Sequence, residues 1–283
     1  MKLVECPRDA MQGLHEFIPT QDKVRYINQL LKVGFDTIDF GSFVSVKAIP
    51  QLRDTTEVLE QLQWKNSASK LLAIVANTRG AEDASRYQAI TYLGFPLSIS
   101  ETFQKRNTNK SIGEALNMLE EIQNICLRSN KRLVTYISMG FGNPYGDPYD
   151  TELVSRFVDI LVTLQSDVIS LADTIGVSSP ESIRHLFSVL TKAYPAVELG
   201  VHLHSNPQTA VEKIEAAYNA GCGRFDGALK GFGGCPMAKD DLVGNLPTET
   251  IIHYLESRGE DTGIDQEELK KSIRLASEIF PKA

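Results

Sequence analysis

The sequence predicts a single α/β domain, residues 1–283, folded as a (β/α)8 TIM barrel with one extra C-terminal helix. Three observations support this prediction. Short β-rich runs alternate with amphipathic helical patterns along the chain, without a break in composition. Eight such strand–helix units suit one closed barrel, a domain type that often reaches this length. No glycine-rich phosphate loop follows the first strand, where an open sheet would normally carry one.

The first half of the chain contains five expected strands, separated by helical patterns. Thr20 is a suitable N-cap for the first main helix, and Gly34 ends it. Ser111 with Glu114 three residues later forms the capping-box pattern of a long helix. The first strand is expected to run directly into a loop. The strands are expected at 2–6, 35–40, 71–76, within 88–99 and at 132–138, and the helices at 20–33, 54–63, 79–86 and 111–129.

The second half repeats the same alternation. Ser179 can cap a helix whose first turn contains Pro180, and Pro207 opens the next helix. The last helix is an addition to the barrel. The strands are expected at 166–173, 197–204 and 224–229, and the helices at 150–164, 180–194, 207–220, 247–258 and 265–279.

Composition excludes several classes of function. Hydrophobic residues make up 42% of the chain, so it can bury a large core, and its formal charge is −7 without a strong basic cluster. Nucleic-acid binding is therefore not expected. No apolar stretch is long enough to cross a membrane. The four cysteines lack metal-finger spacing and no secretory segment precedes them, which indicates a reducing, cytoplasmic location without disulfides.

Polar and ionisable residues gather at the carboxyl ends of the expected strands. In a TIM barrel, the active site lies at this end of the strands. A further loop with three glycines precedes Cys235, after the eighth strand. The polar residues at the strand ends are Arg8, Asp9, Gln12, Asp39, Ser42, Tyr136, Ser138, Ser170, Asp173, His202 and His204.

Two histidines, His202 and His204, stand two residues apart at the end of an apolar strand. Residues i and i+2 of a strand point to the same side, so the two imidazoles can share a metal ion, although either can be a structural histidine. Asp9 is a candidate carboxylate ligand, because one strand alone separates the first and seventh strands of a closed barrel. This mixed N/O site suits Mg²⁺ or Mn²⁺ better than structural zinc.

Four other residues have both a structural and a functional interpretation. Arg8 forms a surface pair with Asp9, or it stabilises an oxyanion beside the metal. Cys235 is an inert cysteine, or a proton carrier or nucleophile on a glycine-rich loop that can close over a substrate. Asp39 and Asp173 are helix caps, or carboxylates of the active site.

Several motifs together resemble the 3-hydroxy-3-methylglutaryl-CoA (HMG-CoA) lyase family of the DRE-TIM metallolyase superfamily. The resemblance covers nearly the whole chain, and its most distinctive parts are the spaced residues of SFVSVKAIPQ and the GGCP loop. The motifs are RDAMQ at 8–12, SFVSVKAIPQ at 42–51, FQKRN at 103–107, ISLADTIGVSSP at 169–180, VHLH at 201–204, GFGGCPMA at 231–238 and GN at 244–245.

The resemblance implies a divalent-metal enzyme without an organic cofactor that splits HMG-CoA into acetyl-CoA and acetoacetate, a reaction of leucine breakdown and ketone-body formation. It implies Asp9, His202, His204 and Asn245 as metal ligands. Arg8 would stabilise the enolate oxygen and Cys235 would transfer protons. Asp39 and Asp173 fall on catalytic positions of the family. The implied substrate-binding residues are Arg8, Gln12, Ser42, Tyr136 and Ser170, the candidates for CoA phosphates are Lys47, Lys105 and Arg106, and the family also favours a homodimer.

Departures from the family pattern keep other functions open. Ala10 replaces a glycine, Asp39 stands where the family has glutamate, and Ser205 replaces an acidic residue. The exit of the first strand is one residue shorter, and the segment from Cys235 to Asn245 one residue longer. The alternatives are a relative that acts on another 3-hydroxyacyl-CoA, an acyl-CoA condensing enzyme, an aldolase or transcarboxylase, and a barrel that binds without catalysis.

Overall fold

The computed structural model describes residues 1–234 and 243–280, and it forms a closed TIM barrel. Within these residues, eight parallel strands pair in chain order from β1 to β8. The β1–β8 pairing closes the ring. A short ninth strand pairs antiparallel with the end of β7. The strands are β1 (Lys2–Glu5), β2 (Thr37–Ser42), β3 (Lys70–Ile74), β4 (Ile90–Ser98), β5 (Arg132–Ser138), β6 (Val168–Asp173), β7 (Glu198–Ser205), β8 (Arg224–Gly227) and β9 (Gly244–Asn245).

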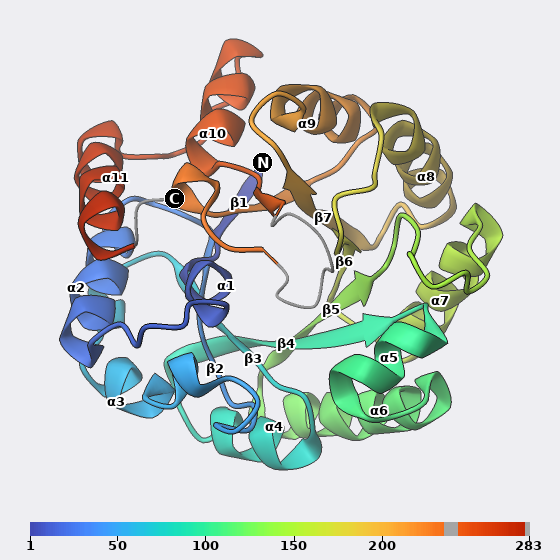
Figure 1. Ribbon diagram of the computed structural model, residues 1–283, viewed down its shortest axis with the longest axis horizontal. Helices are drawn as coiled ribbons and strands as arrows, with labels where there is room; N and C mark the ends of the chain where they lie inside the picture. The colour runs from blue at the N-terminus through green and yellow to red at the C-terminus, as the bar shows by residue number, and fades with distance from the viewer. Residues whose placement is uncertain (235–242, 281–283) are drawn as a thin grey trace.

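Helices surround the strands in a ring, as Figure 1 shows. The last helix, α11, packs against α2, and Phe280 after it contacts the ring of Tyr26 edge to face at 5.5 Å between centroids. No described helix has the length and apolar character needed to span a bilayer. The helices are α1 (Pro7–Gln12), α2 (Thr20–Leu30), α3 (Thr55–Glu60), α4 (Thr78–Ser85), α5 (Glu101–Thr108), α6 (Ile112–Ser129), α7 (Thr151–Thr163), α8 (Pro180–Ala193), α9 (Ala210–Asn219), α10 (Thr248–Ser257) and α11 (Gln266–Ile279).

The structure confirms the barrel, the extra C-terminal helix and two helix starts. Ser111 and Glu114 form the expected capping box of α6. Ser179 caps α8 and Pro180 occupies its first turn. The prediction for Thr20 was wrong, because Pro19 occupies the cap position and the Thr20 hydroxyl donates instead to Asp54 at 2.8 Å.

Two short helices lie where loops or uncertain structure were expected. α1 begins directly after β1, with Pro7 in its first turn, where proline is favoured because its missing N–H costs no helical hydrogen bond. α5 follows β4 and is capped by the side chain of Ser100, which accepts from Phe103 N. Both helices lie at the carboxyl end of the strands and therefore bring side chains to the mouth of the barrel.

The barrel interior changes from apolar to polar on the side formed by β7 and β8. Leu72, Ile74, Tyr92, Val134 and Val168 belong to one buried apolar cluster inside the barrel. Across from it, Arg224 is in register with Gly200, and Asp226 with His202. Asp226 thus lies level with His202 in the interior, and Arg224 lies two residues below it.

Glu5, near the end of β1, is a fully buried carboxyl that ties the strand to the start of α10. It accepts hydrogen bonds from Leu229 N at 2.9 Å and from the Thr248 hydroxyl at 2.5 Å. Burial raises its pKa from 4.5 to about 8, although these two hydrogen bonds oppose the shift. The folded protein therefore retains a proton on Glu5 at pH values where the unfolded chain has lost it.

We expect the free energy of unfolding to fall as pH rises from about 5 to about 8, by up to about 1.4 kcal/mol per pH unit from this group. Glu5→Gln preserves an acceptor and a donor at the same places but cannot ionise. This variant should therefore match the parent near pH 5 and exceed it at pH 8, as measured by urea unfolding at both pH values. Equal pH slopes in the two proteins would contradict the assignment.

Candidate active site

Helix α1 presents three predicted site residues at the mouth of the barrel. It begins where β1 ends and packs beside β2, inside the ring of outer helices (Figure 1). Arg8 donates through Nη1 to Asp9 Oδ1 and to Gln12 Oε1, both at 2.9 Å. Gln12 Nε2 also donates to Asp9 Oδ1 at 2.6 Å. The sequence motif is thus a compact network on one turn of helix.

Each of the two histidines of β7 has an acceptor behind its ring. His204 Nδ1 lies 3.1 Å from the carbonyl oxygen of Thr174, and His202 Nδ1 lies 3.4 Å from Asp226 Oδ2. An acceptor at Nδ1 holds the proton on that nitrogen and leaves Nε2 with a free lone pair. His204 Nε2 is buried and has no hydrogen-bond partner among the described residues.

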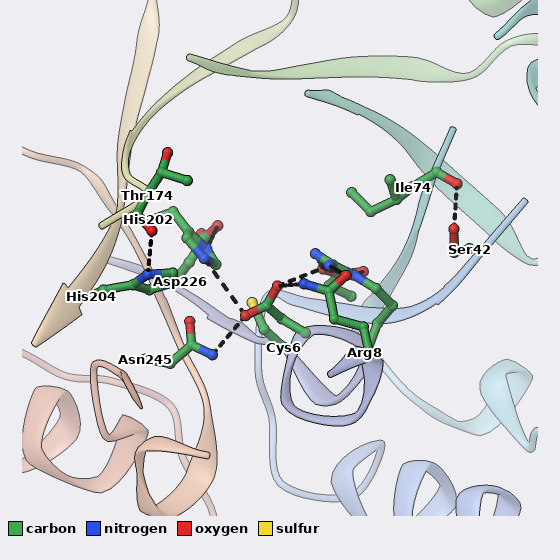
Figure 2. Close-up of polar contacts among 12 residues, drawn as sticks. Cys6, Arg8, Ser42, Ile74, Thr174, His202, His204, Asp226 and Asn245 are labelled. Atoms are coloured by element: carbon green, nitrogen blue, oxygen red, sulfur yellow. Dashed lines mark hydrogen bonds and ion pairs between the residues drawn. The ribbon is translucent and has the colours of Figure 1, made fainter. Parts of the chain in front are cut away.

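Asp9, His202 and His204 offer ligand atoms that lie within 4.8 Å of one another. His202 Nε2 is 4.0 Å from Asp9 Oδ2. In Figure 2, His202, His204 and Asn245 surround one space on the side opposite Arg8. The buried, unpartnered nitrogen and the neighbouring carboxylate suit a divalent cation with N and O ligands.

Asn245 of β9 lies next to these three candidate ligands, with its amide nitrogen turned toward Asp9. Its amide nitrogen donates to Asp9 Oδ2 at 2.8 Å and to the carbonyl of Phe232 at 2.9 Å. Antiparallel pairing of β9 with β7 sets Asn245 opposite His204. The side chain is therefore next to the candidate ligands, and its oxygen would reach a shared ion after rotation of the amide group.

The electrostatics favour charged Asp9 and neutral His204. Burial alone would raise the pKa of Asp9, but Arg8, the two histidines and the Asn245 amide bring it down to about 2. Burial and the neighbouring His202 lower the pKa of His204 to about 4. An ionised carboxylate and a neutral imidazole are the forms that bind metals.

His202 shows the opposite shift. Burial is the largest influence on the pKa of His202 and lowers it, but the hydrogen bond to Asp226 and the charges of Asp9 and Asp226 together raise it. Two carboxylates, Asp9 and Asp226, lie beside His202 at 4.0 and 3.4 Å. Arg8 pairs with Asp9, and Arg224 lies 3.9 Å from Asp226. An ionised carboxylate next to two imidazoles is the kind of surroundings that stabilises a bound cation.

A cavity of about 370 Å³ opens over these groups. Six residues of the predicted site line it, namely Arg8, Asp9, Gln12, Tyr136, His202 and His204, whereas Asp39, Ser42, Ser170 and Asp173 do not. The lining is mostly apolar and also includes Ile49, Phe103 and Arg106. Arg106 lies over the ring of Tyr145 at 4.7 Å. Lys105, in contrast, pairs with Glu101 on an exposed surface.

Tyr136 and Ser170 both have buried hydroxyls without a hydrogen-bond partner in the described part of the chain. The two residues are in register on β5 and β6, and Tyr136 contacts the ring of His202 edge to face at 5.9 Å. Ser42, in contrast, borders a second cavity with Thr55 and Arg53, and its hydroxyl lies 3.4 Å from the carbonyl of Ile74, apart from the histidines in Figure 2. Cys235 lies outside the described residues.

The two predicted catalytic aspartates are buried, and their carboxylates accept hydrogen bonds from other groups of the protein. Asp39 accepts from Arg8 Nη2 at 2.6 Å and Nε at 3.0 Å, so it lies behind the guanidinium rather than in the cavity wall. Burial raises the pKa of Asp39 although Arg8 opposes this shift. Asp173 accepts from Val177 N, Ser178 N and the Ser178 hydroxyl, and Lys213 Nζ lies 3.1 Å away.

Sequence reasoning missed two charged residues that support the histidines. Asp226 stands two positions after Arg224 on β8. Two charged residues at alternate positions of a short buried strand indicate that both side chains face the same side, and this pattern could have identified Asp226. Lys213 Nζ donates to the carbonyl of His204 at 2.8 Å. Lys213 follows Ala210 by three residues and precedes Ala217 by four, on the apolar stripe of α9, so helical spacing identifies it as core-facing.

Comparison with known proteins decides the family. A protein-family model described as HMGL-like matches residues 3–275. The chain belongs to the HMGL-like family. It is 34% identical over 276 residues to hydroxymethylglutaryl-CoA lyase YngG of Bacillus subtilis (strain 168), which covers 98% of this chain and 91% of that protein. The resemblance found in the sequence motifs is therefore confirmed.

Solved structures of HMGL-like proteins agree closely with this barrel. A crystal structure of the HMG-CoA lyase of B. subtilis has a TM-score of 0.92 at 33% identity and covers 98% of this chain and 92% of the other. An HMG-CoA lyase of Acinetobacter baumannii, in complex with coenzyme A and 3-methylmalate, has a TM-score of 0.90 at 30% identity and covers 99% and 90%. The likeness extends over the whole barrel.

Proposed function

We infer that this protein is a carbon–carbon lyase that cleaves HMG-CoA into acetyl-CoA and acetoacetate with the aid of a divalent metal ion. Family membership supports the reaction class. The observation that carries the proposal is the convergence of Asp9, His202 and His204 at the floor of a cavity at the barrel mouth. The complex of the A. baumannii relative with coenzyme A supports an acyl-CoA substrate.

Asp9, His202 and His204 would hold the ion, with Asn245 as a fourth ligand. Because these are nitrogen and oxygen donors, we propose Mg²⁺ or Mn²⁺. When bound, the ion would supply Lewis-acid chemistry that lowers the pKa of the substrate hydroxyl. The fit is supported by the orphaned Nε2 of His204 and by the low pKa of Asp9.

Arg8 would bind the thioester oxygen as negative charge develops there. A guanidinium has five N–H groups, and four of them contact Asp9, Gln12 and Asp39. The second N–H of Nη2 remains for a ligand in the cavity that Arg8 lines. A fixed donor of this kind stabilises an oxyanion without reorganising during the reaction.

The remaining predicted residues would orient the site and move protons. Asp39 holds the guanidinium from behind, and Asp173 holds the loop that carries Thr174. Gln12 and Tyr136 line the cavity and would contact the acyl group. Ser170 on β6 lies beside Tyr136 on β5. Ser42 would act from the neighbouring cavity. We propose Cys235 as the group that exchanges a proton with the acetyl-CoA enolate.

The direct test is cleavage of HMG-CoA by the purified protein, with acetoacetate and acetyl-CoA both quantified. We expect equal amounts of the two products, loss of activity with a chelator, and recovery with Mg²⁺ or Mn²⁺. His204→Ala should abolish turnover, whereas His185→Ala, which removes an exposed imidazole from α8, should not. Absence of cleavage with metal present, or condensation of acetyl-CoA with a 2-oxo acid instead, would refute the assignment.

A further inference from the structure

Asp226 is a buried carboxylate that contacts a candidate metal ligand but does not line the cavity. It is 1% exposed, and its Oδ2 lies 3.4 Å from His202 Nδ1. Figure 2 shows Asp226 beside His202. Register explains the contact, because His202 on β7 pairs directly with Asp226 on β8 and both face the barrel interior. Asp226 is therefore placed to act on the site only through His202.

A buried cation lies below Asp226. Arg224, which is completely buried, has Nε at 3.9 Å from Asp226 Oδ1, and neither atom has a hydrogen-bond partner among the described residues. Gly200, in register with Arg224, makes room for it, because a Cβ at this position would lie 3.1 Å from the Arg224 side chain. On its other side, Arg224 Nη1 lies 3.5 Å from Glu198 and 3.7 Å from Asp36.

We propose that Asp226 is a positioning residue, which fixes the His202 ring so that Nε2 faces Asp9. The proposal rests on the metal centre of the proposed function. A carboxylate that accepts from the far ring nitrogen of a ligating histidine sets both the tautomer and the ring angle, and raises the basicity of the ligand nitrogen. For His204, the acceptor at Nδ1 is the main-chain carbonyl of Thr174. For His202, the acceptor is a side chain, which mutation can change.

One competing arrangement uses the same atoms. Cys6, His202 and Asp226 also offer ligand atoms within 4.8 Å of one another. An ion bound there would use His202 Nδ1, so Asp226 would be a ligand rather than an acceptor. Hard divalent ions prefer oxygen and nitrogen ligands to sulfur, which favours the Asp9 side of the ring.

The test is a titration of the metal-free protein with Mn²⁺, in which free Mn²⁺ is followed by its electron paramagnetic resonance signal. We expect Asp226→Asn, which retains an acceptor oxygen but no charge, to weaken binding about 10-fold, and Asp226→Leu about 100-fold. Asp54→Asn is the matched control, because it breaks the buried Lys23–Asp54 pair of 2.6 Å far from the site. It should leave Mn²⁺ affinity within twofold, and so should Cys6→Ala.

A second readout separates ring positioning from loss of fold. The visible spectrum of the Co²⁺-loaded protein should change in the Asp226 variants and remain unchanged in Asp54→Asn, with urea unfolding recorded for each. Equal Mn²⁺ affinity in the parent and both Asp226 variants would overturn this proposal alone. Loss of affinity in Cys6→Ala would also overturn it, in favour of the competing site. A parent protein that binds no Mn²⁺ would overturn the metal centre itself.

Discussion

Replacing Arg8 with methionine will lower kcat for HMG-CoA cleavage by about 100- to 1,000-fold, the usual effect of removing one donor to an oxyanion. Arg8 is 8% exposed and its guanidinium contacts Asp9, Gln12 and Asp39 at once. Methionine has a similar length and no charge. The variant therefore removes the donor to the thioester oxygen and leaves two buried carboxylates without their cation. Initial rates at saturating substrate and Mg²⁺ measure the effect.

Two further variants show whether the loss comes from the guanidinium itself. Arg8→Lys retains a charge, but an ammonium cannot contact Asp9, Gln12 and Asp39 together, so kcat should remain low. Arg106→Met removes a second guanidinium that lines the same cavity. It should raise KM for the acyl-CoA and change kcat little. An Arg8→Met protein with kcat within threefold of the parent, and with intact fold by urea unfolding, would contradict the role of Arg8.

The direction of the two histidines could be predicted from the sequence because side-chain direction in a strand depends on a simple period of two. His202 and His204 belong to an unbroken strand, so both point toward the cavity as the period requires. Ser42 lies beyond a point where this rule cannot be applied. The register between β2 and β3 shifts between Asp39 and Gly41, which adds one residue to β2, so alternation cannot be counted across this point.

The residues behind the histidines were not predictable in the same way. The position of Asp226 next to His202 depends on the register between β7 and β8, which no local pattern specifies. α1 escaped detection because six residues are too few for a periodic pattern. Local sequence therefore indicated which side chains face the cavity. The groups that hydrogen-bond to those side chains from behind depend on how neighbouring strands pair.

Lys213 contacts the main chain of His204 from behind the site. We expect Lys213→Met to lower the free energy of unfolding by about 3–5 kcal/mol. Its ammonium is buried and contacts Asp173 at 3.1 Å, the carbonyl of His204 at 2.8 Å and the carbonyl of Gly176 at 3.3 Å. Removing the cation leaves Asp173 buried with its charge, and it leaves the end of β7 without a donor. Urea unfolding at neutral pH gives the loss directly.

The double variant Asp173→Asn/Lys213→Met distinguishes a paired charge from simple packing. Neutralising both partners removes the uncompensated charge, so the double variant should lose clearly less stability than the sum of the two single variants. The amide introduced in place of the Asp173 carboxylate would still offer an oxygen to Val177 N or Ser178 N, which preserves part of the turn after β6. Additive losses would mean that Lys213 acts by filling space. A double-variant loss smaller than the sum would show that the two charges interact. If Lys213→Met also binds Mn²⁺ more weakly, the buried pair affects the position of His204, because the same ammonium donates to the carbonyl of that residue.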